Sequence, residues 1–169
     1  ILIVFLFGNR IELNQKTDII LTKLQNQSLN IQIELGNIEI QQLIRDNQNF
    51  ISLSIANQYS TNEPGLPKLP QINQLIEIPY EANPRIEIIN LNEEVYDLDD
   101  FNLEGLIVPA QPSLSKSSNY NETDFIMNQE IYSQNKFIND NTVELKEKGI
   151  LRAVRFGNLI INPIEYNPA

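Results

Sequence analysis

The sequence predicts an all-β domain of the β-sandwich or jelly-roll-like type. Apolar and polar residues alternate with a period of two along several short segments, which is typical of half-buried strands. Turn-forming residues separate these segments. Helical signals are weak, because Ile and Asn are abundant where Ala and Glu would favour helix. Many short strands joined by turns are typical of sandwiches and jelly rolls.

Alternation locates the expected strands in order along the chain. It is clearest at 29–35, and it resumes at 38–40 after Gly36 and Asn37, so we expect these two segments to pair as a hairpin. A phase slip after Ile88 suggests a bulge. The best helical signal covers residues 17–24, and it is weaker than the alternation that predicts the strands. The expected strands are 29–35, 38–44, 50–56, 72–78, 85–91, 103–108, 143–147 and 150–166.

Two stretches between the strands have loop composition. Residues 62–70 hold three prolines and a glycine, which excludes a central strand there. Residues 109–141 form the longest irregular stretch and are rich in Ser, Asn and Gln. A loop this long in a compact domain is usually functional or disordered.

The apolar run at the start of the chain allows two interpretations. Residues 1–7 are continuously apolar, and this run is too short to cross a bilayer, which takes about 20 residues. We interpret residues 1–8 as the remnant of a signal peptide, with a buried first β-strand as the alternative. Residues 9–169 then form one β-sandwich domain, since about 100–200 residues suit a single domain.

Composition narrows the classes of function. The net charge of −10 disfavours nucleic acid and anionic membranes as partners, because both recruit clustered Lys and Arg. The chain has no His and no Cys. It therefore lacks the usual general base, the common nucleophile partner and the commonest transition-metal ligand. We expect a non-catalytic segment with no cofactor.

Two charged motifs have structural interpretations that we favour over functional ones. The acidic run 93–100 could offer oxygens to Ca²⁺, but it lacks the order of a calcium loop, so a solvated acidic turn is the preferred interpretation. Arg152 and Arg155 are three apart in an expected strand and should point to opposite faces. One of them should face inward and need a carboxylate or carbonyl partner.

Three segments, taken in order, resemble the propeptides of gingipain-type cysteine peptidases. The first contains Gly65, Pro67 and Pro70 and precedes an aliphatic strand that ends in a proline. The second is the proline-bearing segment 108–112, which stands before a variable loop. The third runs from Arg152 and Arg155 to Tyr166, Asn167 and Pro168 and is similar to the signature near the end of those prodomains.

The resemblance implies a β-sandwich prodomain that assists folding of a secreted cysteine endopeptidase and keeps it latent. The partner is then the catalytic domain of the same precursor, which is exported through the periplasm. In relatives a basic side chain on a prodomain loop enters the specificity pocket, which makes Lys116, within 113–136, the candidate for that role here. The closing strands of the prodomain are expected after Ala169, so we describe the fold as truncated at its C-terminal end.

A second hypothesis is a carbohydrate-binding or adhesive β-sandwich module of an exported protein. Such modules often display aromatic side chains in a row. The chain has no Trp, and its tyrosines are dispersed along the sequence. This composition favours the propeptide interpretation.

Overall fold

The computed structural model describes residues 2–6, 18–23, 28–113, 125–138 and 141–169. Strands hold 50% of these residues and helices 6%, so the predicted all-β fold class is confirmed. The jelly-roll connectivity stays a prediction. Within the described ranges, no helix is long and apolar enough to cross a membrane.

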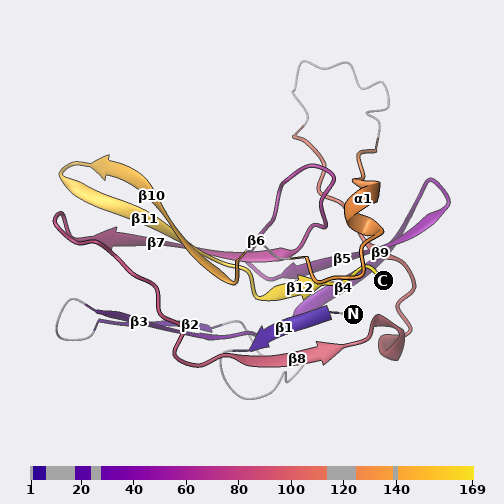
Figure 1. The fold of residues 1–169 in the computed structure, drawn as a ribbon, viewed down its shortest axis with the longest axis horizontal. Helices are drawn as coiled ribbons and strands as arrows, with labels where there is room; N and C mark the ends of the chain where they lie inside the picture. Colours follow the sequence, from indigo (N-terminus) through magenta and orange to yellow (C-terminus); the bar gives the residue numbers. More distant parts are fainter. Residues whose placement is uncertain (1, 7–17, 24–27, 114–124, 139–140) are drawn as a thin grey trace.

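Four sheets make up the described fold (Figure 1). The largest has the strand order β10 (Val143–Leu151), β11 (Val154–Ile161), β7 (Pro70–Ile78) and β6 (Tyr59–Ser60). A second has the order β4 (Ile38–Arg45), β5 (Gln48–Ile55) and β9 (Leu106–Ile107). A third has the order β12 (Ile164–Tyr166), β1 (Leu2–Leu6) and β8 (Asn92–Tyr96). The last pairs β2 (Asp18–Lys23) with β3 (Leu29–Glu34).

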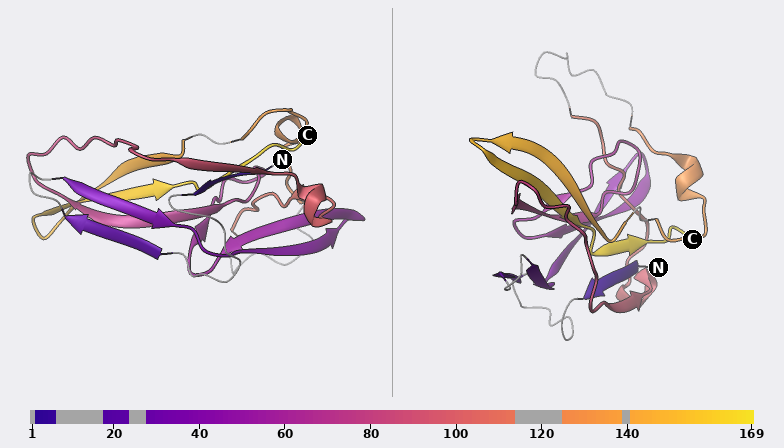
Figure 2. Two further views of the ribbon diagram at one scale, coloured as in Figure 1. Left: turned by 90° about the horizontal axis from the view of Figure 1, so that it is seen from below. Right: turned by 60° about the vertical axis from the view of Figure 1, so that its left-hand side comes forward.

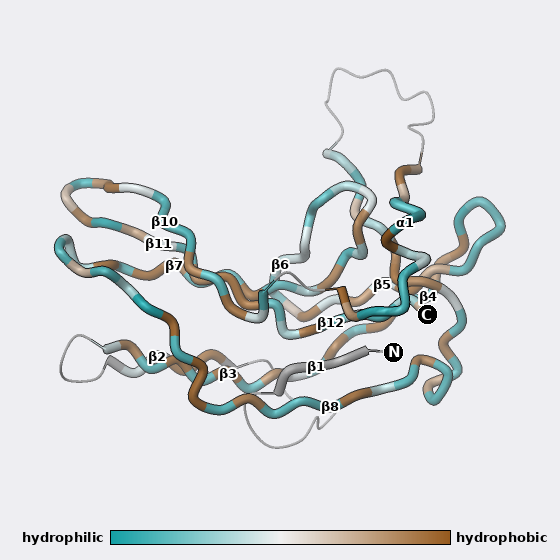
Figure 3. Tube along the Cα trace, in the orientation of Figure 1, coloured by the Kyte–Doolittle hydropathy of each residue, from teal (hydrophilic) through white to brown (hydrophobic). Residues whose placement is uncertain are grey.

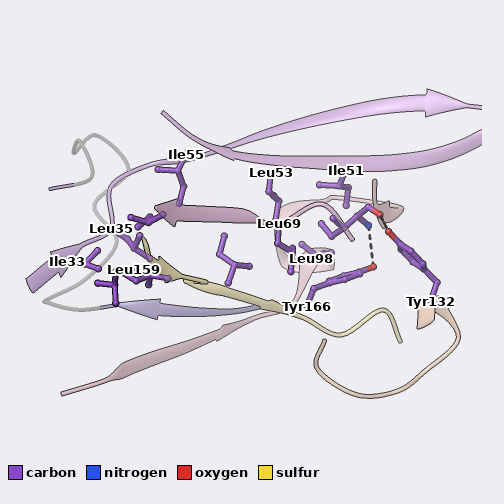
Figure 4. Packing of buried hydrophobic residues seen from close by; sticks show 14 residues of the cluster. Ile33, Leu35, Ile51, Leu53, Ile55, Leu69, Leu98, Tyr132, Leu159 and Tyr166 are labelled. Carbon is purple, nitrogen blue, oxygen red and sulfur yellow. Dashed lines mark hydrogen bonds between the residues drawn. The ribbon is translucent and has the colours of Figure 1, made fainter. Parts of the chain in front are cut away.

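The sheets enclose one apolar core. Strands β2, β3, β1 and β8 run along one side of it, and β7, β10 and β11 run along the other (Figures 1 and 2). Its buried members come from most of the sheets, and Figure 4 shows them from close by. They include Ile33, Leu35, Ile51, Leu53, Ile55, Leu69, Ile72, Leu98, Ile107, Tyr132, Leu159, Ile161, Ile164 and Tyr166. Hydrophobic stretches of β5, β7 and β11 meet in the middle of the molecule, and the tip of the β4–β5 hairpin is hydrophilic (Figure 3).

The hairpin expected between 29–35 and 38–44 is wrong, although both segments are strands. Strand β3 pairs with β2, and β4 pairs with β5. The tight turn lies instead at Asp46 and Asn47, whose φ values are 49° and 61°. Positive φ at both central residues is the pattern of a type I′ turn, and Asn and Asp tolerate it better than most residues.

The weak helical signal at 17–24 is also wrong, because residues 18–23 form β2. Ile19 lies opposite Ile33 in β3. Cross-strand pairing of aliphatic side chains stabilises such a ladder. This pairing outweighs the weak local propensity of the segment for helix.

Two strand predictions near the ends of the large sheet need correction. Residues 85–91 form no strand, and the neighbouring strand is β8 at 92–96. Ile86, Ile88 and Ile89 are exposed, so the alternating pattern in this segment does not mark a strand with one buried face. The strand expected at 150–166 is three pieces, because Arg152 and Ala153 form a turn with φ of 51° and 65° between β10 and β11, and Asn162 and Pro163 separate β11 from β12.

Residues 2–6 form β1, which pairs with β12 and β8 in antiparallel register. A strand at this position is what the alternative interpretation of the apolar run, a first β-strand, expects of the backbone. The signal-peptide interpretation of residues 1–8 stays a prediction, since it concerns processing rather than pairing. Residues 1 and 7–17 lie outside the described residues.

Candidate functional site

Two proline-bearing segments far apart in the sequence pair with each other at one end of the core. Backbone hydrogen bonds of 2.9 and 2.8 Å join 66–68 to 108–110. They flank a bridge in which Pro67 faces Pro109. Residues of a non-hydrogen-bonded antiparallel pair exchange no N–H bonds, so prolines cost no donor at this position. The two proline motifs therefore form one short ladder.

Gly65 connects that ladder to the start of helix α1 (Gln129–Tyr132). Its N–H donates to the carbonyl of Ala110 at 2.8 Å, and its carbonyl accepts from the N–H of Asn128 at 3.0 Å. Its φ is +84°, which residues with a Cβ rarely adopt. A Cβ here would also lie 3.3 Å from both the Asn128 nitrogen and Cγ2 of Ile126. The positive φ therefore strains any residue with a Cβ, and the close approach would also require the neighbouring atoms to shift by a few tenths of an ångström.

The side chain of Gln111 joins the two ends of the segment 112–125. Its Oε1 accepts from the N–H of Ile126 at 2.9 Å, and its Nε2 donates to the carbonyl of Ile126 at 2.8 Å. A side-chain amide offers one acceptor and two donors, so it pairs with the backbone as a neighbouring strand would. The set that holds both ends of the segment is here called the loop base: Gly65, Ala110, Gln111, Ile126 and Asn128.

Phe125 anchors the returning end of the segment on the β4–β5 hairpin. Its ring meets that of Phe50 edge-on, with 5.2 Å between the centroids. The guanidinium of Arg45 lies 4.8 Å from the centroid of Phe125. Phe50 is buried, so the contact is made to a fixed point of the core. A cation–π contact of this kind contributes about 0.5–1 kcal/mol at an exposed site.

Two buried tyrosines, Tyr132 and Tyr166, hold the backbone of Ile107 in β9 (Figure 4). The hydroxyl of Tyr132 donates to the carbonyl of Ile107 at 2.7 Å, and the N–H of Ile107 donates to the hydroxyl oxygen of Tyr166 at 3.4 Å. Burial raises the pKa of Tyr132, and the neighbouring Tyr166 raises it further. Burial also raises the pKa of Tyr166, against a smaller opposing effect of the Ile107 hydrogen bond. Both phenols therefore stay neutral where they hold Ile107.

The C-terminal motif also holds the chain that follows α1. The carbonyl of Tyr166 accepts from the N–H of Ile138 at 2.8 Å. Nδ2 of Asn167 donates to Oδ1 of Asn135 at 2.8 Å, and Asn167 is buried. Residues of all three motifs thus hold the chain on either side of α1, with Gly65 and Gln111 before it and Tyr166 and Asn167 after it.

Lys116, the sequence-predicted pocket-filling residue, lies outside the described residues, as does the rest of 114–124. A shallow cavity of about 250 Å³ opens beside the loop base, lined by Ser60, Thr61, Asn62, Lys68, Ala110 and Gln111. Lys68 is exposed there and places a positive charge next to the loop base. Lys136, also exposed, follows α1 on the returning chain.

The two arginines of the C-terminal motif lie away from the loop base, in the β10–β11 hairpin. Arg152 is an exposed turn residue, so the expectation that it lies in a strand facing away from Arg155 is wrong. Arg155 is mostly buried and forms a bidentate ion pair with Glu147. It also donates to the carbonyl of Ala82 at 2.6 Å. Arg155 thus has both the carboxylate and the carbonyl partner that an inward-facing arginine needs.

The acidic run 93–100 is divided between β8, which ends at Tyr96, and the 3₁₀-helix η1 (Leu98–Phe101), so the expected acidic turn covers only its second half. Oδ1 of Asp97 accepts from the N–H of Asp99 at 3.2 Å, as an N-cap does. Tyr96 donates to Glu94, and burial, followed by that carboxylate, raises the pKa of Tyr96 to about 12. In the described part of the chain, no group of three or more acidic, His or Cys side chains is placed to hold a metal ion.

Sequence reasoning missed Gln111, Phe125, Asn128 and Tyr132. Asn128 has a readable signal, because its side chain accepts from the N–H of Ile131 at 3.2 Å as a helix N-cap, and Asn favours that position. Gln111 has none, since its role depends on which backbone atoms lie opposite it. The exposed tyrosines Tyr59 and Tyr80 belong to separate segments, as their dispersal in the sequence suggested.

Comparison with known proteins gives a consistent result. The Propeptide_C25 family model matches residues 9–169. Lys-gingipain of Porphyromonas gingivalis is 34% identical over 118 residues, which are 70% of this chain. The matched region is 7% of that protein, so the chain spans a small part of the length of this relative.

Two solved structures share the fold. One, described as giving insight into the zymogenic latency of gingipain K from Porphyromonas gingivalis, has a TM-score of 0.83 and 25% identity, covering 98% of this chain and 88% of the other. The second is a complex of the pro- and mature domains of RgpB from the same organism. Its TM-score is 0.74 at 18% identity, covering 89% of this chain and 75% of the other.

Proposed function

The chain belongs to the Propeptide_C25 family, and from that premise we propose that it keeps a gingipain-like cysteine endopeptidase latent by inserting the segment 112–125 into its active-site cleft. The chain is a non-catalytic propeptide domain of such a precursor. The proposed partner is the catalytic domain of the same precursor. A stable complex of this kind buries about 1,600 Å² in total.

The loop base is the observation that carries the proposal. It fixes both ends of the segment through Gly65 and Gln111, and Phe125 fixes the returning end again. A segment held at both ends loses less conformational freedom when it binds than a free chain does. The fold thus lowers the entropic cost of presenting 114–124 to a partner, and the first two family motifs supply Gly65 and Gln111 to this arrangement.

Lys116 is our candidate for the side chain that fills the specificity pocket. It lies within the segment that the loop base presents. An acidic pocket would select a lysine over its neutral neighbours, and a desolvated ion pair there would act as a hot spot. Removing one partner of such a pair costs about 2–5 kcal/mol, or roughly 30-fold to several-thousand-fold in affinity.

The test is an inhibition titration of the cognate catalytic domain with the wild-type chain and with Lys116→Ala. We expect the inhibition constant to rise by roughly 30-fold or more for Lys116→Ala. Lys68→Ala and Lys136→Ala are matched controls, because they remove the same charge from exposed positions of the described fold. An unchanged constant for Lys116→Ala, or a larger loss for either control, would contradict the assignment.

The same domain is proposed to assist folding of the peptidase and to be exported with it. Assistance predicts that the catalytic domain regains activity faster and in higher yield when refolded with this chain than without it. Export through the periplasm to the outside agrees with the signal-peptide interpretation of residues 1–8. Fractionation of cells that produce the precursor would test it, and activity confined to the cytoplasm would contradict it.

A further inference from the structure

Strand β4 presents a free edge in the described part of the fold. It is the outer strand of its sheet, and β5 is its strand partner along all eight residues. Six of those eight residues are exposed. The outward backbone N–H and C=O groups of such an edge are a template for another strand.

The edge of β4 differs from the other long edge of the molecule, β10. Strand β10 carries Glu144, Lys146, Glu147 and Lys148, and charges of this kind protect an edge from pairing. In β4 the charges are confined to Glu39 near one end and Arg45 at the other. Between them Ile40 is 43% exposed and Ile44 is 77% exposed. The sequence of β4 thus leaves its edge open to pairing.

The residues of β4 complement their own reverse. If two copies pair in antiparallel register about a two-fold axis at Gln42, Glu39 of each copy lies opposite Arg45 of the other. Ile40 then lies opposite Ile44, on the same face of the joined sheet. Opposite charges and aliphatic pairs directly across a ladder both stabilise it, and the symmetry makes each contact occur twice.

We propose that β4 is a self-association site, through which two copies of this chain join edge to edge as an antiparallel pair centred on Gln42. The partner is a second copy rather than an unrelated strand, because the charge order of β4 matches its own reverse. A ladder of seven residues on each side is a small interface, below about 1,200 Å², so the dimer belongs to the weak class. The inference does not depend on the inhibitory role proposed above.

The absence of Cys in the chain permits a direct test of the register. In the proposed pairing, the two Cα atoms at position 42 are about 4.5–5.5 Å apart, within the range that a disulfide bridges. Gln42→Cys should therefore cross-link two full chains when oxidised glutathione is added. Gln41→Cys is the control, because its copies would lie about 8 Å apart, beyond disulfide reach. Equal cross-linking of both variants, or of neither, would overturn the register.

A charge exchange tests the same pairing without a covalent bond. Sedimentation equilibrium up to about 200 µM chain should show a monomer–dimer equilibrium, as expected for a weak interface. Glu39→Arg should weaken it about tenfold, because the like charges meet twice. The double variant Glu39→Arg with Arg45→Glu should recover the wild-type constant.

Arg45→Glu alone also loses the contact with Phe125. The double variant shares that loss, so its recovery reports the charge pair itself. Circular dichroism spectra of all variants check that the fold is retained. A monomer at every concentration, or a double variant weaker than Glu39→Arg, would overturn the proposal.

Discussion

The loop base and the tip of the β10–β11 hairpin are built in opposite ways. Beside the loop base, the buried residues Ile107, Tyr132 and Tyr166 are joined by hydrogen bonds across long stretches of sequence, and Gly65 and Ala110 of the loop base are buried as well. At the hairpin tip, Ile150 and Leu151 are exposed, and one guanidinium, that of Arg155, joins the hairpin to the carbonyl of Ala82. Buried contacts are thus concentrated where β9, α1 and β12 meet, and the exposed tip of the β10–β11 hairpin contributes fewer.

The largest expected difference between these regions is in the cost of truncating a side chain. Tyr166→Ala removes a buried aromatic ring from the core and should lower the free energy of unfolding by about 3–5 kcal/mol. Ile150→Ala at the hairpin tip should change it by less than about 0.5 kcal/mol, because that side chain is 61% exposed. Urea unfolding followed by circular dichroism measures both. Equal losses would contradict this concentration of buried contacts.

Alkaline pH should also lower the free energy of unfolding, because the folded-state pKa is raised for the buried Tyr132 and Tyr166 and for Tyr96 in β8. Burial raises the folded-state pKa of Tyr132 and Tyr166 above the ordinary value near 10. The unfolded chain therefore loses these protons first. Stability is fully present below about pH 10 and falls above it by about 1.4 kcal/mol per pH unit for each group.

Urea unfolding at a series of pH values from about 9 to 11 measures that slope. Tyr132→Phe should reduce it, because one of the two buried phenols is gone. Tyr59→Phe is the control, since it removes a hydroxyl from an exposed side chain, and the wild-type slope should persist. A wild-type slope in Tyr132→Phe would show that this phenol is not what the alkaline loss reports.

Gly65→Ala should cost less than Tyr166→Ala but more than a surface change. A residue with a Cβ at φ of +84° loses about 1–2 kcal/mol, and the contacts at 3.3 Å add crowding. Lys68→Ala, an exposed change in the same motif, should stay within about 0.5 kcal/mol of wild type. Thermal unfolding compares the two, and equal melting temperatures would remove Gly65 from its assigned role.

Arg155→Ala should have a smaller effect than Gly65→Ala, about 1 kcal/mol. The ion pair with Glu147 is partly exposed, so solvent screens it, and the remaining loss is the hydrogen bond to the carbonyl of Ala82. The same unfolding assay measures it. A loss as large as that of Tyr166→Ala would mean that the hairpin tip is as tightly held as the buried residues beside the loop base.

What the sequence predicts differs between these regions for a physical reason. Pro67, Pro109 and Gly65 are readable because each imposes a local demand on the backbone: a missing N–H or a positive φ. Alternation at 85–91 predicted a strand wrongly, because alternating apolar and polar residues do not show whether a neighbouring strand is present to pair with the segment. Gln111 and Phe125 could not be found, because their roles depend on Ile126 and Phe50, which only the fold brings near.

The most direct test of the account replaces residues 114–124 with a Gly–Ser linker of equal length and measures inhibition of the cognate peptidase. The loop base and the core stay unchanged, so the melting temperature should be retained. The inhibition constant should rise by at least roughly 30-fold, as for the loss of a hot-spot side chain. Wild-type inhibition by the linker variant would contradict the claim that this segment maintains latency.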